Sequence, residues 1–306
     1  MKERVFTDTT DIFAIDYGDF LEIAGRRYLI KGHEREARFG LDEPKFWVKK
    51  AVDLETGERK IIKLSFFESF EATVGKVKIP CFRNPEKEGL ILKLVGDHPH
   101  FMHGFACHDA KGNNVRVLDI VSGKNFYRTI HALEMDHHQY FQELLPGILE
   151  KLITLFEALR LLHGNGFRHG DIRNDHVIIE EKTGNYVWID FDYDFDSVEN
   201  PFSLDLMGLG NILLFAIGKG FHNLREKESD GENLMYRDLI DRVVPEDFSI
   251  VHKWRFMNLK KLYPYIPHGL NNILAHFTLG SEVFYESVDE ILADLKTCMY
   301  SGMKRP

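Results

Sequence analysis

Cysteine is scarce in this sequence, and no long apolar run is present. The three cysteines, Cys81, Cys107 and Cys298, match neither a disulfide framework nor a paired zinc knuckle, so they favour a reducing compartment. No run approaches the roughly 20 apolar residues that a membrane span requires. The charged and polar start at residues 1–10 lacks the apolar stretch of a signal peptide. We therefore expect a cytoplasmic protein without a membrane span.

Basic residues are outnumbered by acidic ones, with 39 Lys and Arg against 48 Asp and Glu and a net charge of −9. This balance argues against a general affinity for nucleic acid, because a polyanion is repelled, but it permits a small basic pocket for phosphates. A chain of 306 residues can bury a sizeable core as one large domain or as two closely packed lobes. No internal repeat, low-complexity tract or long linker divides the sequence.

Patterns typical of strands dominate the first part of the chain. A Gly-containing turn at residues 53–57 predicts a hairpin between the two runs that flank it. Residues 85–95 predict a helix, because Pro85 occupies a first-turn position and apolar residues follow at helical spacing. The predicted strands cover residues 20–30, 45–52, 59–64 and 114–121.

Helical patterns dominate from residue 140 onward. Residues 140–162 carry a broad apolar face and end at Gly164 and Gly166, as expected of a buried helix. A short apolar hairpin, residues 177–180 and 186–189, interrupts the helical region. Further helices are predicted over residues 204–217, 232–243, 269–277 and 287–299.

The stretch from residue 167 to 192, FRHGDIRNDHVIIEEKTGNYVWIDFD, places acidic residues at both polar ends of this apolar hairpin. Phosphoryl transfer needs one carboxylate to orient the attacking hydroxyl and another to hold Mg²⁺ against the phosphates. We assign Asp171 and Asp190 to these two roles. The segment from His169 to His176 resembles the H-R-D-x-x-x-x-N catalytic loop of the protein kinase-like superfamily, and the segment from Asp190 to Asp192 resembles D-F-G.

This resemblance covers residues 26–297 and is closest to bacterial-type serine/threonine protein kinase-like proteins. It implies an α+β, two-lobed protein kinase-like fold with ATP in the cleft between the lobes. The small β-rich N-terminal lobe would comprise residues 1–119, and the larger helical lobe residues 120–306.

Residues outside the catalytic loop extend the resemblance. Lys63 ends a predicted strand, as the V-A-I-K lysine does in the family, and would contact the α- and β-phosphates. Glu88, on the following helix, would pair with Lys63. The segment around Asp119 and Val121 resembles the connector that receives adenine, and Asp205 resembles the aspartate that braces the catalytic loop.

The region expected to be the glycine-rich loop departs from the family pattern. Residues 32–44 contain only two glycines, Gly32 and Gly40. Because glycine lets the backbone come close to bound phosphates, few positions of this loop could make such contacts. We expect Gly40 to contact the nucleotide, and Arg35 or Arg38 could add phosphate contacts through their side chains.

The metal-binding positions depart from the family pattern as well. His176 stands where the family has a metal-binding asparagine, although Mg²⁺ prefers oxygen ligands to imidazole. Asp192 replaces the glycine of D-F-G and could supply a further carboxylate. The expected metal ligands are thus Asp190, His176 and Asp192, with Mg²⁺ or Mn²⁺ as the ion.

Two features bear on the substrate and on regulation. Gly170 replaces the arginine that receives an activation-loop phosphate in regulated protein kinases, and the H-G-D form resembles aminoglycoside and choline phosphotransferases. No A-P-E motif lies between Asp190 and Asp205. Control by activation-loop phosphorylation is therefore not expected, and the usual peptide platform is absent from the sequence.

The resemblance implies an ATP-dependent phosphotransferase in which Asp171, Lys63 and Glu88 are the catalytic residues. The acceptor would be a hydroxyl group of a protein or of a small molecule. Two alternatives stay open. The first is a pseudokinase that uses the fold as a nucleotide-binding scaffold or switch, and the second is a kinase-fold enzyme that transfers AMP.

Overall fold

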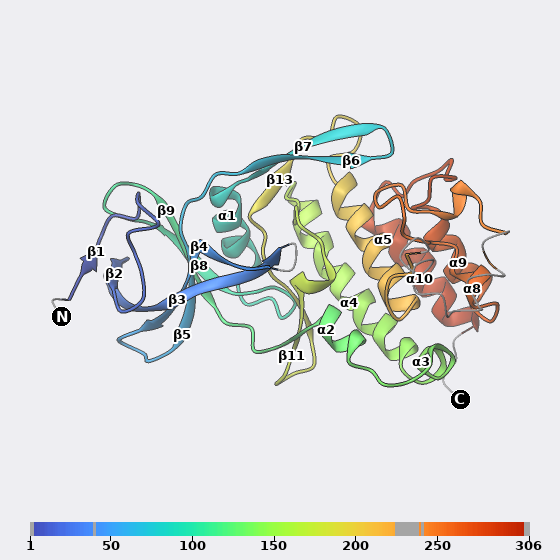
Figure 1. Cartoon of the computed structure of the whole chain (residues 1–306), viewed down its shortest axis with the longest axis horizontal. Coiled ribbons are helices and arrows are strands. Elements are labelled where there is room, and N and C mark those ends of the chain that lie inside the picture. Colours follow the sequence, from blue (N-terminus) through green and yellow to red (C-terminus); the bar gives the residue numbers. More distant parts are fainter. Residues whose placement is uncertain (1–2, 39–40, 224–238, 240–241, 303–306) are drawn as a thin grey trace.

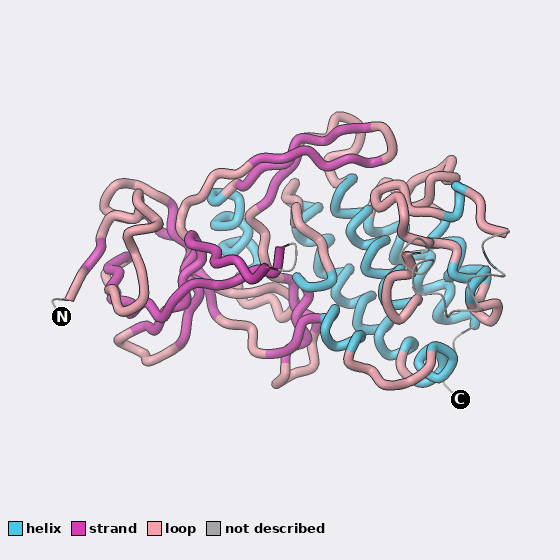
Figure 2. Tube along the Cα trace, in the orientation of Figure 1, coloured by secondary structure: helices cyan, strands magenta, loops and turns pink. Residues whose placement is uncertain are grey.

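Strands gather at one end of the molecule and helices at the other (Figures 1 and 2). The computed structural model describes residues 3–38, 41–223, 239 and 242–302. The architecture is α+β: three sheets are present in the described residues, and the longest helices follow residue 120. In the described part of the chain, no helix combines the length and the apolar character needed to cross a bilayer.

The largest sheet has seven strands in the order β1-β2-β3-β4-β5-β9-β8. The predicted hairpin is confirmed, because β4 and β5 pair with Val48 opposite Lys63 and Gly57 adopts a positive φ of 73° in the turn. The inward side chains of the sheet, among them Tyr28 and Ile62, form a core of their own. The strands are β1 (Val5–Phe6), β2 (Phe20–Ile23), β3 (Arg26–Arg38), β4 (Leu41–Asp53), β5 (Arg59–Lys63), β8 (Gly104–His108) and β9 (Asn114–Asp119).

The helix α1 (Pro85–Val95) has the bounds that the sequence predicts. The side chain of Asn84 caps it by accepting a hydrogen bond from the Lys87 amide, and Pro85 lies in the first turn, where a missing N–H costs least. Ile91 and Leu92 are buried against the main core. The cap and the apolar face together fix the position of the first turn, which carries Glu88.

A three-stranded sheet, β13-β7-β6, was not predicted. It consists of β6 (Ser69–Val74), β7 (Val77–Arg83) and β13 (Tyr193–Phe195). Figure 1 shows the β6–β7 hairpin reaching from the strand-rich end toward the helix-rich end. At its tip the amide of Gly75 donates to the carbonyl of Ile250 at 2.9 Å. Because β13 lies beyond residue 120, this sheet joins the two parts of the chain.

The helix-rich part is organised around the long helix α4. Its residues Leu149, Leu152, Phe156 and Leu159 are fully buried. The helix predicted over residues 140–162 is instead two helices that meet at Leu144. The α-helices here are α2 (Phe126–His131), α3 (His137–Glu143), α4 (Leu145–Gly164), α5 (Ser203–Ile217), α8 (Leu259–Leu262), α9 (His268–Ala275) and α10 (Val288–Gly302).

A third sheet, β10-β11-β12, contains the apolar hairpin predicted between the acidic residues. Its strands are β10 (Gly123–Asn125), β11 (Val177–Glu180) and β12 (Tyr186–Trp188). Short 3₁₀ turns are formed by η1 (Asn174–His176) and η2 (Pro245–Asp247). Of the helix predicted over residues 232–243, nearly all lies outside the described residues.

Candidate active site

A cavity of about 670 Å³ opens beside β4 and β5 and extends to the Asp190 segment. This volume falls within the range of small-molecule and cofactor sites. Asp119 and Val121, the predicted adenine contacts, line the cavity, whereas Gly40 lies outside the described residues. The apolar side chains that line it include Val48, Ala51, Ile61, Leu118, Ile178 and Ile189.

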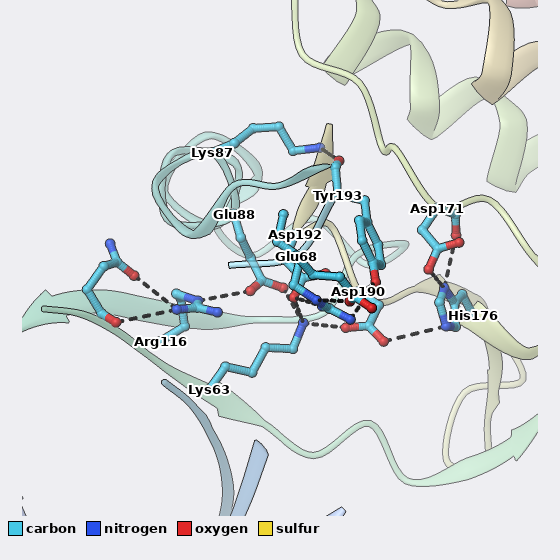
Figure 3. Close-up of polar contacts among 12 residues, drawn as sticks. Lys63, Glu68, Lys87, Glu88, Arg116, Asp171, His176, Asp190, Asp192 and Tyr193 are labelled. Atoms are coloured by element: carbon cyan, nitrogen blue, oxygen red, sulfur yellow. Dashed lines mark hydrogen bonds and ion pairs between the residues drawn. The ribbon is translucent and has the colours of Figure 1, made fainter. Parts of the chain in front are cut away.

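Lys63 lies at the polar end of the cavity, where it joins two carboxylates (Figure 3). Its ammonium group donates to Glu88 Oε1 at 2.7 Å and also bonds to Asp190 Oδ1. Burial alone would lower the pKa of Lys63, but Asp190, Asp192 and Glu88 raise it far above its usual value. Lys63 therefore stays protonated, and an ammonium group in this state is able to bind phosphate.

Two arginines that the sequence analysis did not single out balance these carboxylates. Arg116 of β9 donates through Nε to Glu88 Oε2 at 3.1 Å, and both side chains are almost completely buried. Arg83 of β7 donates to Asp192 Oδ2 at 2.6 Å. Arg116 lies between two valines in a strand, a pattern that could have indicated an internal partner, whereas nothing in the local sequence marks Arg83.

Asp171 and Asp190 face the same imidazole ring (Figure 3). His176 Nδ1 donates to the backbone carbonyl of Asp171 at 2.9 Å and lies 3.4 Å from its Oδ2, while Nε2 lies 3.5 Å from Asp190 Oδ2. The structure thus brings together the two carboxylates that the sequence placed at opposite ends of a hairpin, with His176 between them.

The surroundings of these two carboxylates separate their proton affinities. Burial raises the pKa of Asp171. Burial also acts on Asp190, but the Lys63 ammonium overrides it and holds the pKa of Asp190 well below its usual range. A pair of titratable groups whose environments push their pKa values apart is typical of an acid–base site. Asp171 is the better proton acceptor and Asp190 is the permanently charged group.

Asp190 adopts a backbone conformation that is uncommon for a residue other than glycine, with φ of 69°. Left-handed conformations cost about 1 kcal/mol or more for most side chains and concentrate at functional sites. This strain is offset by the contacts of Lys63 and His176 with the Asp190 carboxylate. The surrounding structure therefore fixes the direction in which this carboxylate points.

The donor set fits a metal that takes only part of its ligands from the protein. Among the described residues, no three His, Cys, Asp or Glu side chains form a group that could hold an ion by themselves. Mg²⁺ commonly binds to one or two carboxylates and completes its shell with phosphates and water. Asp190 can supply such a carboxylate, with His176 beside it. The Asp192 carboxylate is only 2% exposed and forms an ion pair with Arg83 at 2.6 Å.

The loop that leads to Asp171 is braced from the helix α5. Asp205, which is 1% exposed, accepts hydrogen bonds from the amides of His169 at 2.7 Å and Gly170 at 2.8 Å. His163 Nε2 lies 3.0 Å from the same carboxylate. These contacts confirm the structural role predicted for Asp205.

No family model matches this sequence, and a search of curated proteins finds no match either. The function is therefore inferred from the cavity and its residues. Of the predicted site residues, the structure brings together Lys63, Glu88 and Asp190, with Asp171 reached through His176.

Proposed function

We propose that this chain is an ATP-dependent phosphotransferase with a two-lobed, protein kinase-like fold. The observation that carries the proposal is the position of Lys63, which is buried between Glu88 and Asp190 at the polar end of a nucleotide-sized cavity. Asp171 lies on the opposite side of the His176 ring from Asp190. A lysine held by a glutamate and a carboxylate for Mg²⁺ are the parts that phosphoryl transfer requires in the protein kinases.

In this proposal, adenine occupies the apolar end of the cavity near Asp119 and Val121, and the phosphates extend toward Lys63. Asp190 would hold Mg²⁺, which when bound neutralises charge on the phosphates. Asp171 orients the acceptor hydroxyl and takes its proton. The bond from the γ-phosphorus to the bridging oxygen breaks, a bond to the acceptor oxygen forms, and ADP leaves.

Cationic side chains compensate for the scarcity of glycine in the expected phosphate loop. Lys31, Arg35, Lys45 and Lys50 of β3 and β4 line the cavity together with Lys63. Charged hydrogen bonds to phosphate are stronger than neutral ones, so side chains can supply what backbone amides supply elsewhere. In all, eight Lys and Arg side chains and five Asp and Glu side chains line the cavity. This local excess of positive charge, in a chain of net charge −9, supports a polyphosphate ligand.

A nucleotide-binding pseudokinase is the second candidate. It is favoured by one observation, the engagement of Asp192 by Arg83, which leaves Asp190 as the main carboxylate for a metal. Asp171 distinguishes the two candidates, because a scaffold needs the cavity but does not need a proton acceptor.

The test compares wild type with Asp171→Asn, using Asp196→Asn as the control because Asp196 is exposed. The phosphotransferase proposal predicts that Asp171→Asn lowers turnover by about 100-fold or more and leaves nucleotide affinity nearly unchanged. Nucleotide binding without turnover in wild type would favour the pseudokinase. Release of pyrophosphate with transfer of AMP, in place of ADP release, would identify an AMP transferase.

A further inference from the structure

Lys87 is a buried cation that the proposed reaction does not use. It precedes Glu88 on α1 and is 5% exposed. Its ammonium group donates to the backbone carbonyls of Arg168 at 3.0 Å and His169 at 3.1 Å, and also to the carbonyl of Tyr193 (Figure 3). All three donors of the ammonium group therefore point at backbone carbonyls. Lys87 forms no salt bridge within the described ranges of the chain.

Burying a charge without a carboxylate partner is unfavourable. Burial lowers the pKa of Lys87, and nearby carboxylates offset this effect only in part. An apolar side chain at this position would avoid the burial of a charge, but it would leave the buried carbonyls of Arg168, His169 and Tyr193 without this donor. The three contacts show that Lys87 holds particular backbone segments.

The three carbonyls belong to the two segments that carry the reacting carboxylates. Arg168 and His169 directly precede the loop of Asp171, and Tyr193 follows Asp190 by three residues. The neighbouring Glu88 binds Lys63 from the same helical turn. One turn of α1 therefore fixes the catalytic loop, the Asp190 segment and the phosphate-binding lysine.

Besides the contacts of Lys87, backbone hydrogen bonds also join the start of α1 to the Asp190 segment. In the sheet, Tyr193 of β13 pairs with Arg83 of β7. The amide of Asn84, the cap of α1, donates to the carbonyl of Asp192 at 2.6 Å. A movement of α1 away from the cavity would have to break this pairing as well as the contacts of Lys87.

Gly170 shows why this arrangement excludes a side chain next to Asp171. Its φ of +88° is a conformation that L side chains rarely adopt. A Cβ atom there would collide with the carbonyl oxygen of Tyr193 and would lie 3.0 Å from Lys87 Nζ. The space beside the catalytic loop is thus filled by Lys87 and Tyr193 from outside the loop.

We propose that Lys87 is a positioning residue that holds the catalytic loop and the Asp190 segment in working alignment, so that the enzyme is active without phosphorylation. This inference rests on the proposed phosphotransferase function. Lys87 comes from α1 and is fixed by its three carbonyl partners, and in this proposal it takes the part that an arginine and an added phosphate play in regulated kinases. Lys87 does not touch the reacting atoms, and its effect is on alignment.

The test compares wild type, Lys87→Met and the control Lys93→Met, which alters an exposed lysine on the same helix. Displacing reacting groups by about 1 Å can cost about 100-fold in rate. We expect Lys87→Met to lower kcat by about that factor and to change KM for ATP by less than about threefold, while Lys93→Met matches wild type. A purely structural role would lower the amount of folded protein and leave the kcat of the folded fraction unchanged. Intact mass spectrometry of the assayed wild type should show no phosphate.

Lys87→Gln keeps the measurement decisive if the methionine variant does not fold. Its amide retains two donors, so we expect a kcat between those of wild type and Lys87→Met with an unchanged unfolding midpoint. Equal kcat in wild type and Lys87→Gln, or wild-type activity that appears only after phosphorylation, would overturn the inference. Absence of ATP turnover in wild type under all metals would instead refute the proposed function on which it rests.

Discussion

Replacing Arg116 with methionine removes one of the two cations that hold the fully buried Glu88. Arg116 Nε lies 3.1 Å from Glu88 Oε2, and Lys63 Nζ lies 2.7 Å from Oε1. At an effective dielectric constant of about 20, two unit charges at such a distance interact by about 5 kcal/mol. Breaking a buried pair by removing one partner costs about 3–5 kcal/mol. Because Lys63 still pairs with Glu88, we expect the free energy of unfolding to fall by an amount at the lower end of this range, about 3 kcal/mol.

The loss would be measured by urea unfolding followed by circular dichroism, with Arg160→Met as the matched control. Arg160 pairs with Asp289 at 2.7 Å, but these side chains are 54% and 62% exposed, so its removal should cost less than about 1 kcal/mol. A double variant with Glu88→Met should lose less stability than the two single variants combined. A loss below about 1 kcal/mol for Arg116→Met would refute the view that Arg116 supports Glu88.

Two further predictions concern pH. Because burial raises the pKa of Asp171, and this group must be deprotonated to accept a proton, kcat/KM should fall on the acid side at a pH above the usual carboxyl value of about 4; a profile that stays flat down to pH 4 would contradict this. Burial also lowers the pKa of His169 to about 3 from 6.5, so the unfolded state binds a proton in this interval that the folded state does not. The free energy of unfolding should therefore rise by about 1.4 kcal/mol per pH unit from about pH 3 to about pH 6.5. Above this range, the contribution of His169 should be fully present and no longer change with pH. His169→Phe should flatten this slope in urea titrations, and an unchanged slope would show that His169 is not its source.

The sequence predicted best where local signals agree. The helix over residues 85–95 has a cap, a first-turn proline and an apolar period, and the structure reproduces its bounds. The short hairpin around residues 177–189 was likewise found from its apolar runs and turn residues. The contact of Lys63 with Glu88 at 2.7 Å is the one that the resemblance to the protein kinase-like superfamily implies.

The sequence predicted poorly where distant segments meet. The strand β13 is only three residues long, and β7 contains Pro80, which disfavours a strand assignment. Their pairing joins segments more than 100 residues apart, so no local pattern reports it. The same separation hides the contact of Arg83 with Asp192, which the sequence does not indicate.

The most direct test of phosphoryl transfer is ADP release from ATP, with Mg²⁺ and Mn²⁺ compared, in wild type and Asp190→Ala. Asp196→Ala serves as the control, because its exposed carboxylate lies in the same acidic run. We predict metal-dependent ATP binding in a thermal-shift assay and ADP release that disappears in Asp190→Ala and persists in Asp196→Ala. Wild type that neither binds nor turns over ATP with either metal, or ADP release that survives in Asp190→Ala, would contradict the proposal.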